Sequence, residues 1–413
     1  MARVAVNPEL IRWAIRRAAA EDWIEKRFPM VTKWLGNETR PTLKQLEQFA
    51  KATSTPIGYF FLPAPPEIKL PIPHYRTIGD TRAAKPSVNL LDTIFTMQRR
   101  QAWMREYLMD LGHEPLPFVG SCELSSHPRD VAQNIRNTLG LQNGWASVCR
   151  SWTEALQFLL GKIEEIGILV VRNGIVGNNT HRKLDVNEFR GFVLVDAYAP
   201  LLFINGADGK AAQMFTVAHE LAHIWYGQSA AFDLSGLQSS VQRIEQACNQ
   251  TAAEFLVPED EMRAAWHGVK DSRDRFDQLA RRFKVSSIVT ARRALDLQLI
   301  TKSEFFDFYH EWLKNDRDRE DEARGNFYRN QNFRVGRRFA EAVYTSVKEG
   351  RLLYTEAYRL TGLSGDAFVK YGKYLGLRCS HGPVHPTRPI PPNHSFRTGC
   401  QCFYPRTQDL LCF

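Results

Sequence analysis

The stretch Met214-Phe215-Thr216-Val217-Ala218-His219-Glu220-Leu221-Ala222-His223-Ile224-Trp225 decides the fold of this chain. Its apolar residues recur at helical spacing, which predicts a helix that buries one face. His219 and His223 are four residues apart, so they share a helix face and can bind one metal ion. Glu220 is offset from both and can reach a water molecule on that ion. Metal-assisted hydrolysis of a peptide bond needs these residue types.

Three short runs before this helix are rich in β-branched and aromatic residues: 168–171, 192–195 and 201–204. Each is bounded by Gly, Asp, Pro or Asn, so we expect three strands that pair into a small sheet. The predicted fold class is therefore α+β and mostly helical. The alternative interpretation of the motif is a pair of hydrogen-bonded histidines on an ordinary helix.

A catalytic zinc site usually has three protein ligands and keeps a fourth position for water. One solution, a Gly and a third His at fixed places after the motif, fails because Tyr226 and Ser229 occupy those places. The other common solution is a Glu on a second helix. Glu245 is one candidate, with Asn249 one turn further on to hydrogen-bond a ligand. Glu254 competes with it, and because the two lie nine residues apart they fall on opposite helix faces.

The composition is that of a globular protein. The chain has 413 residues, of which 44% are hydrophobic, enough to bury cores in two or three domains, and this excludes the disordered and fibrous classes. The formal net charge of +9 favours polyanionic partners without identifying one. No run approaches the roughly 18 apolar residues of a membrane helix, and the N-terminus lacks the apolar stretch of a signal peptide. We expect a cytoplasmic protein with no membrane partner.

The seven cysteines are unevenly distributed, which argues against a disulfide framework through the chain. Cys248 is interpreted as a small buried residue rather than as a ligand or nucleophile. A terminal group of Cys and His residues lacks zinc-finger spacing, and its prolines favour a disordered tail. This group consists of Cys379, His381, His385, His394, Cys400, Cys402 and Cys412.

Residues 1–62 carry the pattern of a small helical domain. Pro8 follows the cap residue Asn7 at one helix start, and Pro41-Thr42 opens a second helix after the turn at Gly36. We interpret this region as a helix-turn-helix unit, with a helical scaffold carrying ordinary surface charges as the alternative. The candidate DNA-contacting residues are Arg12, Arg16, Lys33, Arg40 and Lys44.

The remaining chain divides, by composition and pattern, into five parts. We predict a Pro-rich linker at 63–85, a core at 86–265, a helix-turn-helix-like subdomain at 266–300, a helical module at 301–376 and a disordered tail at 377–413.

Two helical segments have patterns but no assigned chemistry. Residues 279–293 predict two helices around a Val-Ser turn, the second carrying Arg292 and Arg293. We favour a packing subdomain with solvated arginines here over a DNA-reading unit. Residues 327–373 are a further helical stretch rich in Tyr, Phe and Arg.

Several motifs together resemble the ImmA/IrrE metallo-endopeptidases. They are His219-Glu220-Leu221-Ala222-His223, then Glu245-Gln246-Ala247-Cys248-Asn249, then Ala252-Ala253-Glu254-Phe255-Leu256-Val257-Pro258. Arg190-Gly191-Phe192 resembles a strand that precedes the motif in this family. Residues 40–47 and 56–63 resemble the Xre-type helix-turn-helix region fused to longer members. The likeness covers roughly residues 7–375 and ends after Gly376.

The resemblance implies a zincin-like core with helical flanks, zinc ligation by His219, His223 and Glu245, and Glu220 as the general base. Members of the family cleave regulatory DNA-binding proteins, often repressors, and several are linked to stress response or toxin-antitoxin operons. The leading hypothesis is therefore a zinc endopeptidase that cleaves a repressor or antitoxin, with an N-terminal domain that binds DNA or a partner. The alternative is a DNA-binding regulator or antitoxin whose metallopeptidase-like domain is a sensor or scaffold.

Overall fold

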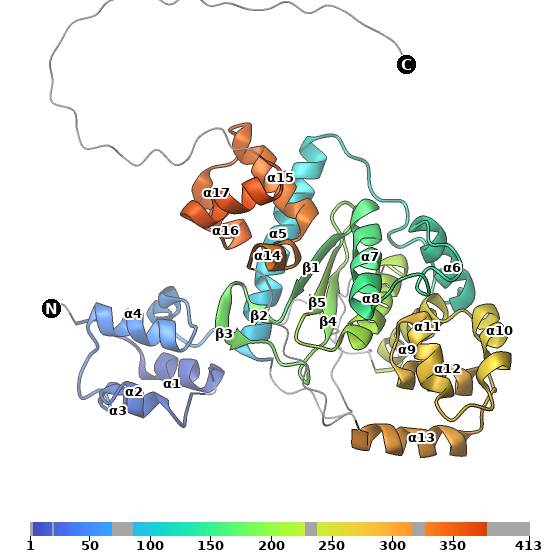
Figure 1. Ribbon diagram of the computed structural model, residues 1–413. Helices are drawn as coiled ribbons and strands as arrows, with labels where there is room; N and C mark the ends of the chain where they lie inside the picture. The colour runs from blue at the N-terminus through green and yellow to red at the C-terminus, as the bar shows by residue number, and fades with distance from the viewer. Residues whose placement is uncertain (1–2, 19, 68–85, 228–237, 316–326, 378–413) are drawn as a thin grey trace, which may run out of the picture.

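The computed structural model describes residues 3–18, 20–67, 86–227, 238–315 and 327–377. Figure 1 shows an N-terminal helical domain beside a larger body, in which a small sheet lies between two groups of helices. The fold is α+β and mostly helical, as the sequence predicts. Within the described residues, no helix has the length and apolarity needed to cross a membrane. Most of the predicted linker, and the tail with its Cys and His group, lie outside the described residues.

The N-terminal domain is built from four short α-helices and a 3-10 turn. They are α1 Pro8–Arg17, α2 Ile24–Arg27, α3 Val31–Leu35, α4 Leu43–Ala52 and η1 Ile57–Phe61. Asn7 caps α1, whose first residue is Pro8, and Thr42 forms a capping box with Gln45 at the start of α4. The apolar faces of these helices meet in a core of their own around Phe49. Local cap chemistry therefore sets where these helices begin, and burial holds them together.

The central sheet has three strands, β1 Leu169–Asn173, β4 Gly191–Leu194 and β5 Leu201–Asn205, in the order β1-β5-β4. β1 runs parallel to β5, and β4 runs antiparallel to it. All five residues of the central strand are buried, because both faces of the sheet are covered. Leu202 and Ile204 point into one hydrophobic core, and Leu201 and Phe203 point into another.

A second, two-stranded sheet was not predicted. β2 Ile175–Val176 and β3 Asn179–Lys183 form an antiparallel hairpin. Its strands bury no residue fully, so the hydrophobic alternation that predicts a strand is absent from the sequence.

One face of the sheet is covered by the helix that contains the HExxH segment and by the helices around it. These helices are α6 Pro128–Thr138, α7 Trp152–Glu165, α8 Lys210–Trp225, α9 Gln238–Leu256, α10 Glu259–Val269, α11 Arg275–Phe283, α12 Ser287–Asp296 and α13 Lys302–Asn315. Their buried residues form one continuous cluster that extends from Phe118 to Phe305. Helices α11, α12 and α13 therefore share the hydrophobic core of α8.

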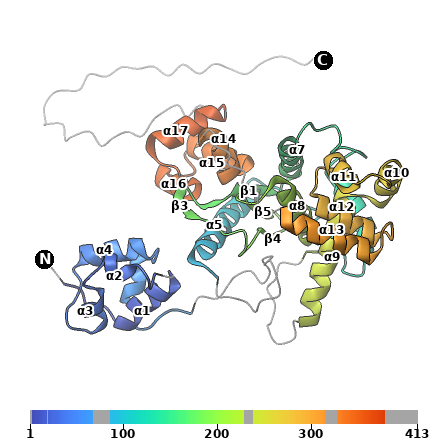
Figure 2. The ribbon, with the colours of Figure 1, turned by 60° about the horizontal axis from the view of Figure 1, so that its bottom comes forward.

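The other face of the sheet is covered by α5 Val88–Asp110 and by α14 Phe327–Val335, α15 Arg337–Lys348, α16 Tyr354–Thr361 and α17 Gly365–Tyr374 (Figures 1 and 2). Arg100 of α5 is buried here and has four backbone acceptors. It donates to the carbonyls of Leu360 and Thr361 at the end of α16 and of Arg334 and Val335 at the end of α14. A cation at two helix C-termini is favourable, and it joins α5 to helices far away in the sequence.

Candidate metal centre

Helix α8 presents the HExxH residues from the interior of the molecule. Every residue from Thr216 to Trp225 is buried, which the sequence could not show for the polar members. The helix packs on β4, β5 and α7 and lies along α9. His219, Glu220 and His223 are exposed by only 2%, 4% and 5%. Buried polar groups are retained when they have partners, so the neighbours of these three residues determine what the site can do.

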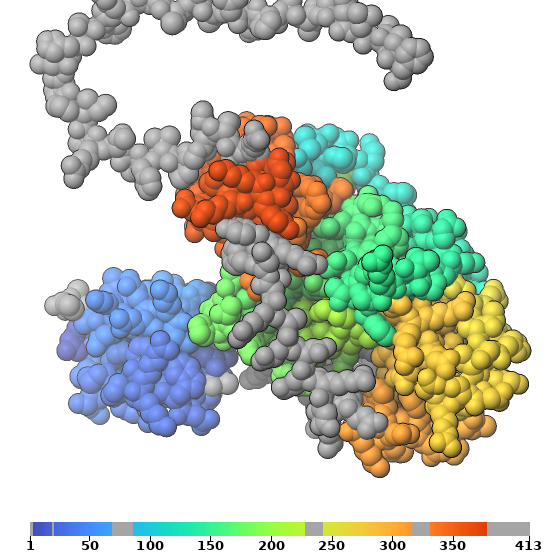
Figure 3. All heavy atoms as spheres, in the orientation of Figure 1, coloured from blue at the N-terminus to red at the C-terminus, as the bar shows by residue number. Residues whose placement is uncertain are grey.

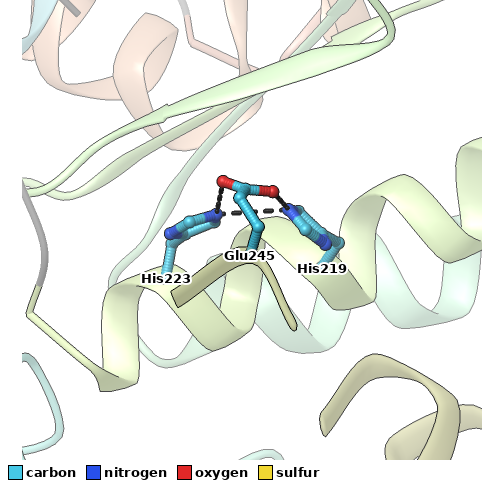
Figure 4. A group of neighbouring side chains, drawn as sticks. All are labelled: His219, His223 and Glu245. Carbon is cyan, nitrogen blue, oxygen red and sulfur yellow. Dashed lines mark hydrogen bonds and ion pairs between the residues drawn. The ribbon is translucent and has the colours of Figure 1, made fainter. Parts of the chain in front are cut away.

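The three predicted ligands converge on one point (Figure 4). The Nε2 atoms of His219 and His223 are 3.2 Å apart, and they lie 3.2 and 3.3 Å from the two carboxylate oxygens of Glu245. Tetrahedral zinc with bonds of about 2.0–2.1 Å separates neighbouring ligand atoms by about 3.3–3.4 Å. Among the described residues, this is the group of His, Cys, Asp or Glu side chains that is arranged to hold a metal ion. The donors and their spacing fit a divalent cation such as zinc.

Asn249 orients one of the imidazoles. Its Oδ1 atom lies 3.1 Å from Nδ1 of His219. With the proton on Nδ1, His219 donates to this amide oxygen, and its Nε2 lone pair faces the centre of the site. An outer partner of this kind fixes the tautomer and the ring plane of a metal-binding histidine. Glu245 and Asn249 are one turn apart on α9, so both groups face α8.

The electrostatics of the site favour positive charge at its centre. Burial alone would raise the pKa of Glu245, but hydrogen bonds and charge interactions with His219 and His223 hold it well below its ordinary value. Burial alone would lower the pKa of His223, but hydrogen bonds with Cys248 and Glu245 raise it well above its ordinary value. A pocket that stabilises both an anionic carboxylate and a cationic imidazole suits a metal cation.

Cys248 is a buried neighbour of the site, as the sequence interpretation proposed. Its side chain is fully buried, and burial raises the pKa of its thiol although the hydrogen bond with His223 opposes this. A thiol with a raised pKa carries little thiolate, which is the form that binds metals. Cys248 therefore packs beside His223 without joining the three ligand atoms.

Glu220 lies on the side of α8 that faces the edge strand β4. A Cβ atom at Gly191 of β4 would lie 3.7 Å from Cγ of Glu220, 2.5 Å from Cγ2 of Thr216 and 2.9 Å from the carbonyl oxygen of Phe203. Only glycine leaves room for this approach. This role of Gly191 was not predicted, although a glycine beside a strand pattern is a signal of close backbone approach. β4 pairs with β5 on one side, and within the described sheet its other edge is unpaired.

Glu254, the competing ligand candidate, points to a different part of the core. It forms an ion pair with Arg293 and accepts a hydrogen bond from the backbone N–H of Glu259 at the start of α10. Arg293 also donates to the carbonyl of Val257, and burial lowers its pKa to about 10. The expectation that Arg293 is solvated is therefore wrong, because its guanidinium is buried against Glu254. Arg292 is exposed and pairs with Asp296.

The five basic residues proposed for DNA contact are all exposed. Arg12 and Arg16 lie on α1 and Lys33 lies on α3, while Arg40 precedes α4 and Lys44 lies in its first turn. Arg12 is held by Glu9 and by the carbonyl of Leu35. These residues belong to the N-terminal domain and take no part in the metal centre.

Comparison with known proteins adds two matches. Residues 163–295, about a third of the chain, match the family model for the IrrE N-terminal-like domain of the M78 peptidases. This segment runs from α7 to α12 and contains all three ligand candidates and Glu220, so this part of the chain is metallopeptidase-like. Residues 335–374 match a domain of unknown function. No curated protein matches the chain.

Proposed function

We propose that this protein is a zinc-dependent endopeptidase that cleaves a regulatory DNA-binding protein such as a repressor or an antitoxin. The observation that carries the proposal is the convergence of His219, His223 and Glu245 at the spacing of tetrahedral ligands, with Glu220 beside them. The match to the M78 peptidase domain over 163–295 supports the same chemistry.

The chain's own residues divide the chemical work. His219, His223 and Glu245 would hold the ion, and Asn249 would keep His219 in its binding tautomer. A bound zinc ion supplies Lewis acidity, lowering the pKa of a water molecule and polarising the scissile carbonyl. Glu220 takes the proton from the attacking water and returns it to the leaving amine as the peptide bond breaks. Its burial excludes bulk water, which strengthens its interactions with the reacting groups.

The edge strand offers a way to hold a substrate. The unpaired edge of β4 carries backbone donors and acceptors in the strand that packs on α8. An extended peptide that adds to this edge would lie along the side of the sheet that Glu220 approaches. This favours an unfolded or extended segment of a protein substrate over a compact domain.

The N-terminal domain would supply DNA or partner binding, with Arg12, Arg16, Lys33, Arg40 and Lys44 as the candidate contacts. Their exposure leaves them available to a phosphate backbone. The second candidate function is a DNA-binding regulator in which the metallopeptidase-like domain is a sensor or scaffold. DNA binding by the same exposed basic residues would then be the main activity of the protein.

A Glu220→Gln variant tests the proposal. Zinc-loaded full-length protein is incubated with a library of peptides derived from a whole proteome, and new termini are identified by mass spectrometry. We expect the variant to keep zinc and to lose cleavage by at least about 100-fold, the effect of removing a positioned general base. Glu106→Gln, at an exposed position of α5, is the matched control and should cleave like wild type.

Cleavage by Glu220→Gln at the wild-type rate would refute the assigned mechanism. If neither protein cleaves any peptide, while the wild-type chain binds its own promoter with an affinity that falls steeply with salt, the regulator function replaces the peptidase function.

A further inference from the structure

The last two helices of the body form a helix-turn-helix. α16 ends at Gly362, whose φ of 72° places it in the left-handed region that favours glycine. Leu363 is buried, and Ser364 is extended as the cap residue of α17. A three-residue turn that contains glycine is typical of two helices joined in a helix-turn-helix. The sequence pattern predicts a helical module here but indicates no chemistry for it.

A third helix, α15, supports the pair from inside. Tyr344 of α15 stacks on Phe368 of α17 with ring centroids 4.1 Å apart, and its hydroxyl donates to the carbonyl of Phe368. Tyr354 and Tyr358 of α16 meet the same ring edge-on. The inner face of α17 is therefore fixed by aromatic packing, and its opposite face is directed outward.

The outward face of α17 is polar and carries two lysines. Asp366, Lys370 and Lys373 follow the helical spacing of one face, and all three are exposed. Residues 331–377 contain eight Lys or Arg residues and four Asp or Glu residues, so this module is basic. In Figure 3 the orange-red residues form part of the outer surface. An exposed second helix with basic side chains is the arrangement that reads the major groove in helix-turn-helix proteins.

Helices α11 and α12 are joined by a similar three-residue turn, but other parts of the body pack against it. Lys284 takes the left-handed conformation with φ of 55°, and Ser286 is the extended cap residue of α12. There, however, Trp152 of α7 donates to the carbonyl of Val285, and Ile288 and Val289 in the first turn of α12 pack on the core. The first turn of α12 is covered, whereas Ser364 and Asp366 at the start of α17 are exposed.

We propose that α17 is a recognition helix that enters the major groove of duplex DNA, which makes the C-terminal module a DNA-binding surface separate from the N-terminal domain. Asp366 lies in its first turn, where side chains of a recognition helix reach base edges, and Lys370 follows one turn later on the same face. Lys373, one turn further, is placed to contact a phosphate. This inference does not depend on the proposed peptidase function.

Selection from short duplexes of random sequence tests this proposal. Full-length protein carrying Glu220→Gln is used, so that peptide hydrolysis does not affect the measurement. We expect Asp366→Asn to change the base preferred at one position of the enriched sequence. Lys302→Ala/Lys314→Ala, at exposed positions of α13, should leave that position unchanged. An enriched sequence that all α17 variants share with their parent would overturn the proposal.

The salt dependence of binding to the enriched duplex provides the second measurement. Lys370→Ala/Lys373→Ala should weaken binding and reduce the slope of log K against log salt by about one to two, because each lost phosphate contact releases one counterion fewer. Lys302→Ala/Lys314→Ala removes the same charge from exposed positions of α13 and should keep the parental slope. Equal slopes for the two double variants, or no binding to any duplex at low salt, would refute the assignment.

Discussion

Helix α9 carries two carboxylates that the protein uses in opposite ways. Glu245, near the middle of the helix, faces the imidazoles of His219 and His223. Glu254, near its end, faces the guanidinium of Arg293. Arg293 brings a permanent positive charge, whereas a neutral imidazole brings none. The charge of Glu254 is therefore compensated by the fold itself, and that of Glu245 is compensated only when a proton or a cation is added.

This difference predicts separate consequences for the two residues. A carboxylate paired with arginine holds the fold together, because its removal leaves a buried charge without a partner. A carboxylate paired with two histidines could hold a cation, because the three groups together favour positive charge.

Zinc content separates the two glutamates most sharply. Glu245→Gln should lower zinc affinity by more than the about 10- to 100-fold that loss of an outer partner causes, because a ligand is removed. Glu254→Gln should retain one zinc ion per folded chain. Metal analysis of the two purified proteins after dialysis measures this. Equal zinc content in both would contradict the assignment of Glu245 as the third ligand.

The free energy of unfolding should depend more on Glu254 than on Glu245. Glu254→Ala leaves Arg293 buried without its carboxylate, so we expect the free energy of unfolding to fall by about 3–5 kcal/mol. Glu245→Ala, compared in the metal-free state, should cost much less because it leaves no permanent charge unpaired. Urea unfolding of metal-free proteins gives both values. A larger loss of stability for Glu245→Ala would show that the carboxylate of Glu245 also stabilises the fold.

Asn249 tests whether the orientation of His219 affects metal binding. Asn249→Ala removes the acceptor for Nδ1 of His219 and frees the imidazole to change tautomer. We expect zinc affinity to fall by about 10- to 100-fold, with little change in the stability of the metal-free protein. Competition with a chelator of known affinity measures the change. Gln250→Ala, at the next and exposed position of α9, is the control and should bind zinc like wild type.

Glu164 of α7 is a third carboxylate, paired neither with a buried arginine like Glu254 nor with histidines like Glu245. We expect its replacement to have the smallest effect of the four. It accepts from the backbone N–H of Arg337 at the start of α15, and burial raises its pKa to about 7 from 4.5. Because the folded state holds this proton more tightly, ionisation costs stability as pH rises from 4.5 to 7. Glu164→Gln should therefore be stabilised relative to wild type by about 1 kcal/mol at pH 8, after allowance for partial exposure.

Measurement at low pH provides the control for the effect of Glu164→Gln on stability. Below pH 4.5 the carboxyl group is protonated in both states, so the stability difference between Glu164→Gln and wild type should vanish. Thermal unfolding at both pH values measures it. A difference that does not change with pH would mean that the carboxylate is not penalised at this position.

The sequence predicted the parts of the site that depend on one helix. The spacing of His219 and His223 places them on one face of α8, and the spacing of Glu245 and Asn249 does the same on α9. These are local consequences of helical geometry and do not require knowledge of the fold. The three strands of the central sheet were predicted for a similar reason, since their apolar runs are short and clearly bounded.

Long-range partners could not be predicted. Arg293 read as a surface residue because nothing in its neighbourhood shows that Glu254, 39 residues earlier, lies against it. An apolar helix face, such as those of α11 and α12, does not reveal from the sequence which surface covers it. The hairpin of β2 and β3 was missed for a local reason, because its strands bury no residue fully and so carry no hydrophobic alternation.

The sequence by itself indicated the kind of chemistry, because HExxH followed by a helical Glu is typical of a metal site with a nearby base. Tertiary structure decided which glutamate joins the histidines and which arginine is internal. It also decided which of two similar helix pairs, α11–α12 or α16–α17, exposes the start of its second helix among the described residues. The physical reason is that a repeat of 3.6 residues fixes which side chains share a face, whereas burial and charge compensation arise only when distant faces meet.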